Sequence, residues 1–333
     1  MEDKIKISIP ETVLELLRKD CADFKLLKDN GDRNFNLFMN TLVANFYEEF
    51  CAAEMKLRER VEEAISAVPE RYKGEVAANV LKLYTSGNAE RMGKSAVFAF
   101  KPTKISEYAV EYIETVALKD ESLSSFYRRM LTAYSEKHKN QRERIIHREN
   151  YEKLREAMKN GVAVSMTISG GNTVRAASVY AVAEGKDELF NYVLAYNGKS
   201  NTTCRLASVK SVFLLTERAE IPEANAELFE KQIRYGAQYP FYNTDGKPIK
   251  VRLTDKGKSL FRKIYLYRPE PISIDGDVYT FECSANQLVY YFQRFGENAV
   301  IISPGKLGVF MRNYYYFALK KYREIYGANG YEE

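Results

Sequence analysis

The first residues of the chain alternate polar and apolar side chains with a period of two and then meet a proline. Residues 4–9 read Lys-Ile-Lys-Ile-Ser-Ile, so the three isoleucines share one face of a predicted strand, while Lys4 and Lys6 share the other. Pro10 ends the strand because proline cannot donate to a strand ladder. A lone strand with one apolar face is not stable in water, so this segment requires a second strand as its partner.

Two predicted helices follow this strand. Residues 11–24 carry apolar side chains at helical spacing, residues 28–32 form a polar loop, and a second helix starts near Asn34 and runs to about Val68, before a proline. This order of elements, together with the run Ile-Ser-Ile-Pro-Glu-Thr-Val at residues 7–13, resembles the ribbon-helix-helix family. The resemblance implies a paired two-stranded ribbon that can enter the DNA major groove, with Lys4 and Lys6 as candidate nucleic-acid contacts.

A second copy of the same plan is predicted over residues 96–138. It would provide the missing strand within one chain; the alternative is a short edge strand followed by unrelated helices. Ser122 is the predicted N-cap of its second helix, and Arg128 and Arg129 in the first turns of that helix are candidate phosphate contacts or solvated side chains. If this strand is the partner, its outward residues Val97, Ala99 and Lys101 offer few hydrogen bonds to base edges, which counts against sequence-specific reading of DNA.

A charged helix predicted over residues 137–159 connects this region to five short strands. These strands are expected at residues 162–168, 173–182, 189–196, 203–206 and 211–215, with a Ser-Gly-Gly-Asn turn after the first. Five short strands in about sixty residues are typical of a small barrel.

The segment 154–221 resembles a WYL domain, a Sm-like SH3 β-barrel. The resemblance lies in the glycine turn, Arg175, the strand Asn191-Tyr192-Val193-Leu194 and the run Cys204-Arg205-Leu206. The chain departs from the family pattern where Trp-Tyr-Leu reads Asn-Tyr-Val, and at Ser178 and Ser208, which replace a proline and a second arginine. The resemblance implies that Arg175, Tyr192 and Arg205 are ligand contacts, with the arginines on phosphate and the tyrosine stacked on an unpaired base. The alternatives are a core position for Tyr192 and ion pairs with glutamate for the arginines.

The last third of the chain resembles the extension that commonly follows WYL domains, as seen in the Asp275-Gly276 turn and the run Ser303-Pro304-Gly305-Lys306-Leu307 before a tyrosine-rich helix. The expected fold class is therefore α+β multidomain, with a ribbon-helix-helix helical domain at 1–150, the barrel at 151–221 and an α+β extension at 222–333. This combination resembles the WYL-domain accessory proteins of type VI-D CRISPR-Cas systems. That resemblance implies a non-enzymatic protein that binds single-stranded RNA and stimulates an RNA-guided RNase.

Charge is concentrated in two places. The chain has 50 basic and 45 acidic residues, but residues 128–148 hold seven basic and two acidic side chains, and residues 247–268 hold eight and one. Such runs are either solvated faces or contacts for a polyanion.

Other classes of function lack their sequence signatures. There is no phosphate-binding loop, dinucleotide fingerprint or nucleophile elbow, and the four cysteines and two histidines have no metal-ligand spacing, so we expect no cofactor, no metal and no enzymatic activity. The first residues lack a signal-peptide pattern and no apolar run is long enough for a membrane span, so we expect a cytoplasmic protein without membrane contact.

The aromatic runs at residues 290–292 and 314–317 predict an interface as well as a core, because consecutive helical residues point in different directions. We therefore expect a homodimer that binds single-stranded RNA, and that contacts a CRISPR effector nuclease. The alternative is a DNA-binding transcriptional regulator with a nucleotide-sensing WYL domain.

Overall fold

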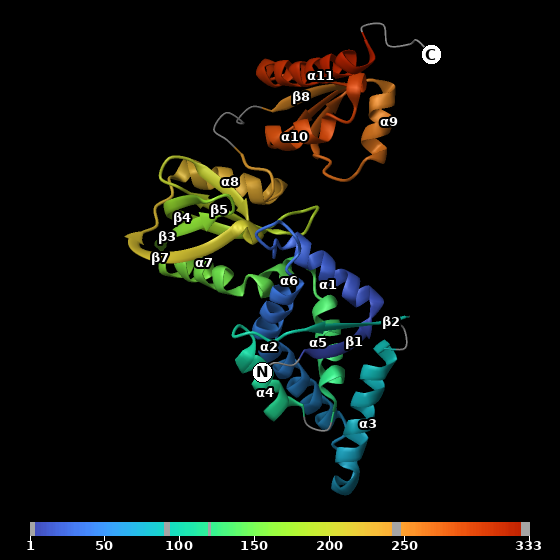
Figure 1. The fold of residues 1–333 in the computed structure, drawn as a ribbon. Helices are drawn as coiled ribbons and strands as arrows, with labels where there is room; N and C mark the ends of the chain where they lie inside the picture. Colours follow the sequence, from blue (N-terminus) through green and yellow to red (C-terminus); the bar gives the residue numbers. More distant parts are fainter. Residues whose placement is uncertain (1–3, 90–93, 119–120, 242–247, 328–333) are drawn as a thin grey trace. The chain divides into compact units, whose positions relative to one another are not determined.

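A computed structural model describes residues 4–89, 94–118, 121–241 and 248–327. The chain mixes helices with three small antiparallel sheets, as the expected α+β class requires (Figure 1). It divides into two compact units, residues 1–151 and 152–333, which are described separately. Within the described ranges, no helix has the length and apolar character needed to cross a membrane.

The N-terminal unit is built on a two-stranded ribbon. β1 (Ile5–Pro10) pairs antiparallel with β2 (Ser95–Phe100), with Ile7 opposite Phe98. Ile7, Ile9 and Phe100 are buried, so the period of two in the sequence places the apolar face inward, and the second strand comes from the same chain. The helices of this unit are α1 (Glu11–Asp23), α2 (Phe35–Ala64), α3 (Glu70–Ala89), α4 (Glu107–Tyr112), α5 (Leu123–Ser135) and α6 (Lys139–Ile146).

Local side chains determine where these helices begin and end. Asn34 caps α2 by accepting a hydrogen bond from the Leu37 amide at 3.1 Å, and Ser122 caps α5 in the same way. The helix expected to reach Val68 ends at Ala64, because the residues before Pro69 form turns.

The charged connector is two helices and not one. α6 ends at Ile146 and α7 (Arg148–Asn160) begins after His147, which leaves helical geometry with φ −105° and ψ 32°. The His147 Nε2 atom lies 3.0 Å from the Phe24 carbonyl oxygen, a tertiary contact that sequence periodicity does not reveal.

Asn40 of α2 forms hydrogen bonds to the segment that follows strand β2 of the ribbon. It is fully buried, its amide donates to the Lys101 carbonyl at 3.0 Å, and its side-chain oxygen accepts from the Thr103 amide at 2.7 Å and the Ser106 hydroxyl at 2.6 Å. These hydrogen bonds satisfy the Lys101 carbonyl and the Thr103 amide, where the chain leaves β2.

The C-terminal unit contains a five-stranded antiparallel sheet in the order β6-β5-β4-β3-β7. Its strands are β3 (Val162–Ile168), β4 (Asn172–Glu184), β5 (Asn191–Tyr196), β6 (Asn201–Arg205) and β7 (Val209–Arg218). Each of the five expected strands is present, with the third starting at Asn191 because Leu189 has a positive φ of 56°. Among the described residues, no backbone ladder joins β6 to β7, so hydrogen bonds do not close this sheet into a barrel.

A second sheet follows, in the order β11-β8-β10-β9. Its elements, with the preceding helix, are α8 (Glu223–Tyr235), β8 (Ile249–Leu253), α9 (Asp255–Lys263), β9 (Pro271–Asp275), β10 (Val278–Phe281), α10 (Ala285–Phe292), β11 (Ala299–Ser303) and α11 (Gly305–Tyr326). Asp275 and Gly276 lie where β9 turns into β10, and Gly276 has a φ of 58°. They therefore form the predicted hairpin turn.

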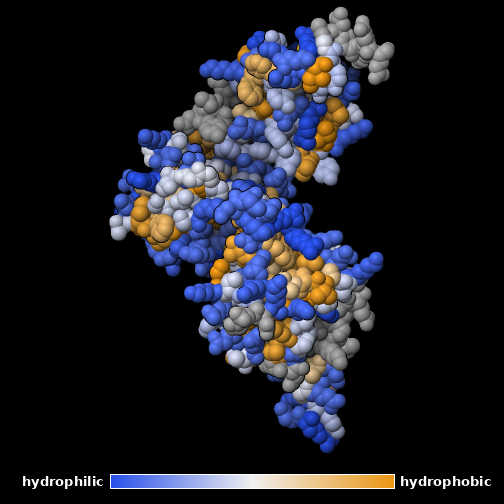
Figure 2. Space-filling model, viewed as in Figure 1, coloured by the Kyte–Doolittle hydropathy of each residue, from blue (hydrophilic) through white to orange (hydrophobic). Residues whose placement is uncertain are grey.

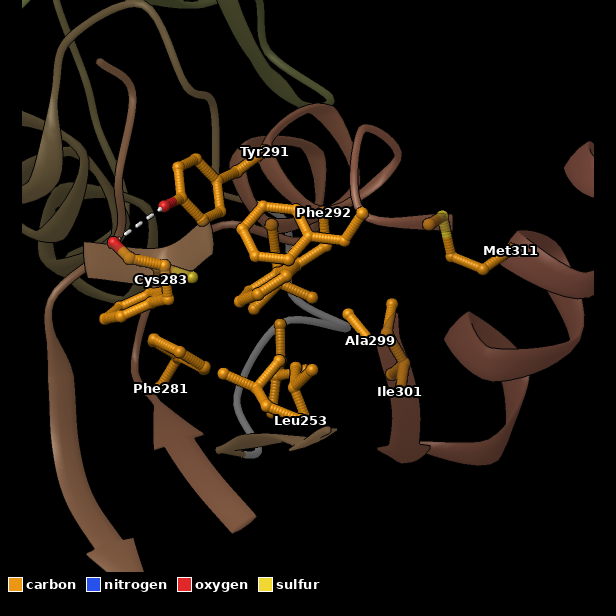
Figure 3. Packing of buried hydrophobic residues seen from close by; sticks show 13 residues of the cluster. Leu253, Phe281, Cys283, Tyr291, Phe292, Ala299, Ile301 and Met311 are labelled. Carbon is orange, nitrogen blue, oxygen red and sulfur yellow. Dashed lines mark hydrogen bonds between the residues drawn. The ribbon is translucent and has the colours of Figure 1, made fainter. Parts of the chain in front are cut away.

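The core of this second sheet is aromatic. Figure 3 shows Phe281 and Leu253 of the sheet beneath Tyr291 and Phe292 of α10, with Met311 reaching in from α11. Tyr291 is fully buried, and its hydroxyl donates to the Ile264 carbonyl at 2.6 Å, which satisfies the polar end of the ring.

Candidate nucleic-acid interface

The outer face of the ribbon carries the lysines that the sequence predicted for it. Lys4 and Lys6 are exposed, and the register places Lys6 opposite Ala99 and Ser8 opposite Val97. Val97 is 70% exposed, so the second strand presents a methyl-lined surface to solvent. Half of this ribbon therefore lacks groups that can read base edges.

Arg128 and Arg129 of α5 serve the fold. The Arg128 Nε donates to the Ser8 carbonyl at 2.7 Å, and the Ser8 amide donates to the Ser124 hydroxyl at 3.2 Å, so α5 satisfies the backbone of β1. Arg129 lies between the carboxylates of Glu54 and Glu121. Arg129 is therefore held by two carboxylates, whereas Arg128 uses its Nε atom for the backbone of β1, and the role of both arginines as phosphate contacts stays a prediction.

Most of the first basic run is neutralised inside the N-terminal unit. Arg142 donates to the buried Asp20 carboxylate at 2.7 Å, and Lys139 lies 2.9 Å from Asp23. Lys137 lies 2.7 Å from Glu49, and Arg148 lies 4.0 Å from the same residue. The charge excess in the sequence therefore does not become a cationic surface here.

The second basic run lies on β8 and α9, where the exposed cations Lys250, Lys256, Arg262 and Lys263 have no ion pair among the described residues. The Thr254 hydroxyl caps α9 by accepting from the Gly257 amide at 3.0 Å. A Cβ at Gly257 would lie 2.1 Å from the Asn298 carbonyl oxygen, so only glycine lets α9 pack this closely against the backbone of Asn298. Lys247 lies outside the described residues.

Tyr192 and Arg205 are direct neighbours on β5 and β6. The guanidinium carbon of Arg205 lies 3.4 Å from the centroid of the Phe190 ring, which is a close cation–π contact. Tyr192 is only 9% exposed. A buried ring cannot accept a stacked base, so the structure does not support Tyr192 as the predicted stacking surface.

The turn between β4 and β5 is held by Gln238, which lies after α8, and by Tyr267. Gln238 accepts from the Lys186 amide at 3.3 Å and donates to Asp187 at 3.1 Å, and the Tyr267 hydroxyl donates to Glu188 at 2.8 Å. Burial raises the pKa of Asp187.

Helix α8 itself packs on the same half of the sheet. Phe229 stacks on Tyr180 with ring centroids 5.0 Å apart, and the Gln232 amide donates to the Thr203 hydroxyl at 3.0 Å. Together with the contacts of Gln238 and Tyr267, this packing covers the outer face of β4, β5 and β6.

Arg175 is exposed and lies apart from the Tyr192–Arg205 pair. It belongs to the half of β4 that pairs with β3, whereas Tyr192 lies opposite Ala183 on the half that pairs with β5. The register therefore does not bring the three family positions into one site.

Sequence reasoning did not single out Phe213 of β7, which is 60% exposed. It belongs to the continuous apolar run Val212-Phe213-Leu214-Leu215, and a continuous run does not show which residue faces solvent.

No family model matches this sequence, and no curated protein matches it. A solved structure described as the crystal structure of a CRISPR Cas-related protein aligns with a TM-score of 0.62 and 18% identity, covering 97% of this chain and 95% of that one. The proteasome accessory factor B/C (PafBC) of Arthrobacter aurescens aligns with a TM-score of 0.24 and 16% identity over 68% of this chain and 39% of that one, a score too low to indicate a shared fold. The chain therefore has the fold of the CRISPR Cas-related protein over nearly its whole length.

Proposed function

We propose that this protein is a non-enzymatic accessory protein of a CRISPR system, of the type VI-D kind, which binds single-stranded RNA and stimulates an RNA-guided RNase. The cations of α9 support RNA binding, since Lys256, Arg262 and Lys263 are exposed without carboxylate partners among the described residues. The association with CRISPR rests on the whole-length structural likeness and on the resemblance of the sequence to that family.

The strand order supports a Sm-like SH3 type for the five-stranded sheet. Numbered within the sheet, its strands lie in the order 4-3-2-1-5, and the fourth and fifth are separated only by a 3₁₀ turn at Leu206–Ser208. Small sheets of this kind bind flexible strands through loops and exposed faces.

The test is a titration of the whole protein with labelled single-stranded RNA and with duplex DNA across a salt series. We expect tighter binding to the single strand, with an affinity that falls as salt rises. Equal or tighter binding to duplex DNA would contradict the proposal. Cleavage of the RNA by highly purified protein would contradict its non-enzymatic part.

The ribbon favours a second candidate function, a DNA-binding regulator with a nucleotide-sensing WYL domain. Lys4 and Lys6 are exposed on the outer face of a ribbon that forms within one chain. If the protein regulates transcription, changing Lys4 and Lys6 to alanine should abolish a palindromic DNA footprint. If it acts on RNA, the same variant should retain single-stranded RNA affinity within about twofold, because α9 is untouched. Footprinting and RNA titration of one variant therefore separate the two functions.

We also propose that the protein acts as a homodimer through α11. Phe310, Tyr314 and Phe317 are 55%, 45% and 61% exposed and recur at helical spacing along one stripe, and hydrophobic residues are visible on the surface over this helix (Figure 2). An exposed apolar stripe along a helix is typical of an interface, and two copies can pair through the same patch.

Replacement of Phe317 by glutamate is expected to convert the dimer to a monomer in light scattering coupled to size exclusion, because two carboxylates would be buried at a two-fold contact. Arg312→Glu, an exposed change on the other side of the same helix, is the control. If the Phe317 variant and the wild-type protein have the same mass, α11 is not the interface.

A further inference from the structure

On the outer face of the five-stranded sheet, β3 lies between β7 and the first half of β4 (Figure 1), and Phe213 of β7 and Arg175 of β4 are exposed there. Two rows of outward residues cross these three strands. We call them together the β3–β7 face: Arg175, Ser165 and Phe213 in one row, and Thr173, Thr167 and Ser211 in the other.

Phe213 is the aromatic residue of this face. It lies opposite Ser165 on β3, and its neighbours Val212 and Val164 point into the core. With 60% of its surface exposed, the ring gains little from burial at this position. The Lys153 ammonium of α7 lies 5.8 Å from the ring centroid, so a cation borders the ring on one side.

A β-bulge places Arg175 in the same row. Val164 pairs with Ala177 and Met166 pairs with Val174, so Ser165 alone faces two residues of β4. One of them is Arg175, and Ala176 beside it has a left-handed φ of 49°. A bulge of this kind changes the direction of a side chain at the edge of a site. It puts an exposed arginine on the other side of Ser165 from Phe213.

The chemistry of these six positions fits an unpaired nucleic-acid strand. They comprise one aromatic ring, one arginine and four hydroxyl groups, with no carboxylate. Neighbouring strands are about 4.8 Å apart, so Arg175 and Phe213 lie roughly 10 Å apart across β3. A base stacked on the ring leaves the phosphates of the adjoining nucleotides within reach of Lys153 and Arg175.

We propose that Phe213 is a base-stacking platform for single-stranded RNA, with Arg175 and Lys153 as phosphate contacts near the ring. The inference rests on the proposed RNA binding and assigns a specific face to it. Tyr192 is the aromatic residue that the family resemblance indicates, but it is buried on the other half of the sheet, which is formed by β4, β5 and β6. The stacking role therefore passes to a residue on β7.

The test measures the affinity of the full-length protein for a labelled oligouridylate and for an abasic strand of the same length. Stacking on an aromatic side chain contributes about 1–3 kcal/mol per base, so Phe213→Ala is expected to weaken oligouridylate binding by roughly five- to a hundredfold. Phe213→Trp should retain wild-type affinity, because it keeps an aromatic plane. On the abasic strand, wild type and Phe213→Ala should bind equally, since no base is present to stack.

Two further variants complete the design. Arg175→Ala should weaken both strands alike and reduce the salt dependence, as expected of a phosphate contact. Tyr108→Ala removes a 71% exposed aromatic ring from the N-terminal unit and should leave both affinities unchanged.

The outcomes distinguish this inference from the proposed function. If wild-type protein does not bind oligouridylate, the proposed function fails. If wild type binds and Phe213→Ala binds equally well, RNA binding stands and the platform is elsewhere. If Phe213→Ala weakens binding to the abasic strand as much as to oligouridylate, the ring does not act by stacking and the inference is overturned.

Discussion

Replacement of Arg142 by methionine is expected to lower the free energy of unfolding of the protein's N-terminal unit by about 3–5 kcal/mol. Asp20 is 1% exposed and accepts hydrogen bonds from Arg142 Nε at 2.7 Å, from Arg142 Nη2 at 3.1 Å and from the Tyr134 hydroxyl at 3.1 Å. Methionine fills much of the arginine volume but leaves a carboxylate buried without its cation. Chemical denaturation of wild type and variant, followed by circular dichroism, measures the difference.

The same variant should respond to pH. Burial raises the pKa of Asp20 in the wild-type protein, despite the opposing effect of Arg142. Without Arg142 that pKa rises further, so the folded state binds a proton more tightly than the unfolded state does. The part of the stability loss that comes from the unpaired carboxylate should therefore return as the pH falls through the folded-state pKa, and that part should be fully recovered below the unfolded pKa.

The double variant Asp20→Asn, Arg142→Met is the matched control. It removes the buried charge with its partner, so we expect it to be less destabilised than Arg142→Met and to lose the added pH dependence. If the single and double variants were equally unstable at pH 7, the loss would come from packing and not from an unpaired carboxylate.

The second large effect is expected from the α9 cations. Changing Lys256, Arg262 and Lys263 together to alanine should weaken single-stranded RNA binding by roughly ten- to a hundredfold at low salt. Each phosphate contact on a single strand adds about 0.7 to the slope of log affinity against log salt, so three lost contacts should reduce that slope by about 2. Fluorescence anisotropy at several salt concentrations gives both quantities.

A triple change of equal charge on α2 separates local contact from net charge. Lys56, Arg58 and Arg60 are exposed in the N-terminal unit, and their replacement by alanine lowers the net charge by the same amount. We expect this variant to bind RNA nearly as well as wild type. Equal losses from both triple variants would mean that α9 is not a contact surface.

The regular elements were largely predictable from the sequence. The alternation of residues 4–9, the caps Asn34 and Ser122, and the Asp275-Gly276 turn depend on local geometry, and each is present in the structure. The break at His147 was not predictable, because it coincides with a contact to Phe24, the residue that follows α1 far away in the sequence. Helical periodicity reports which face is apolar but not where a tertiary contact interrupts the backbone.

The candidate site was less predictable than the fold. The resemblance to WYL domains indicated Arg175, Tyr192 and Arg205, but the register separates Arg175 from the other two, and Tyr192 is buried. A motif shows which residue types are present, whereas tertiary packing decides which of them solvent can reach. Phe213 emerged only when the register showed which residue of an apolar run faces outward.

The distribution of charge shows most clearly the difference between what the sequence indicates and what folding adds. Neighbouring residues were enough to indicate most strands and helices and the two basic runs, because these features depend on local spacing. Folding brings Arg129 to Glu54, 75 positions away, and Arg142 to Asp20, 122 positions away, and so neutralises them, while the α9 cations stay exposed. Ion pairing requires two groups within a few ångströms, and distance along a chain does not determine distance in space until the chain has folded.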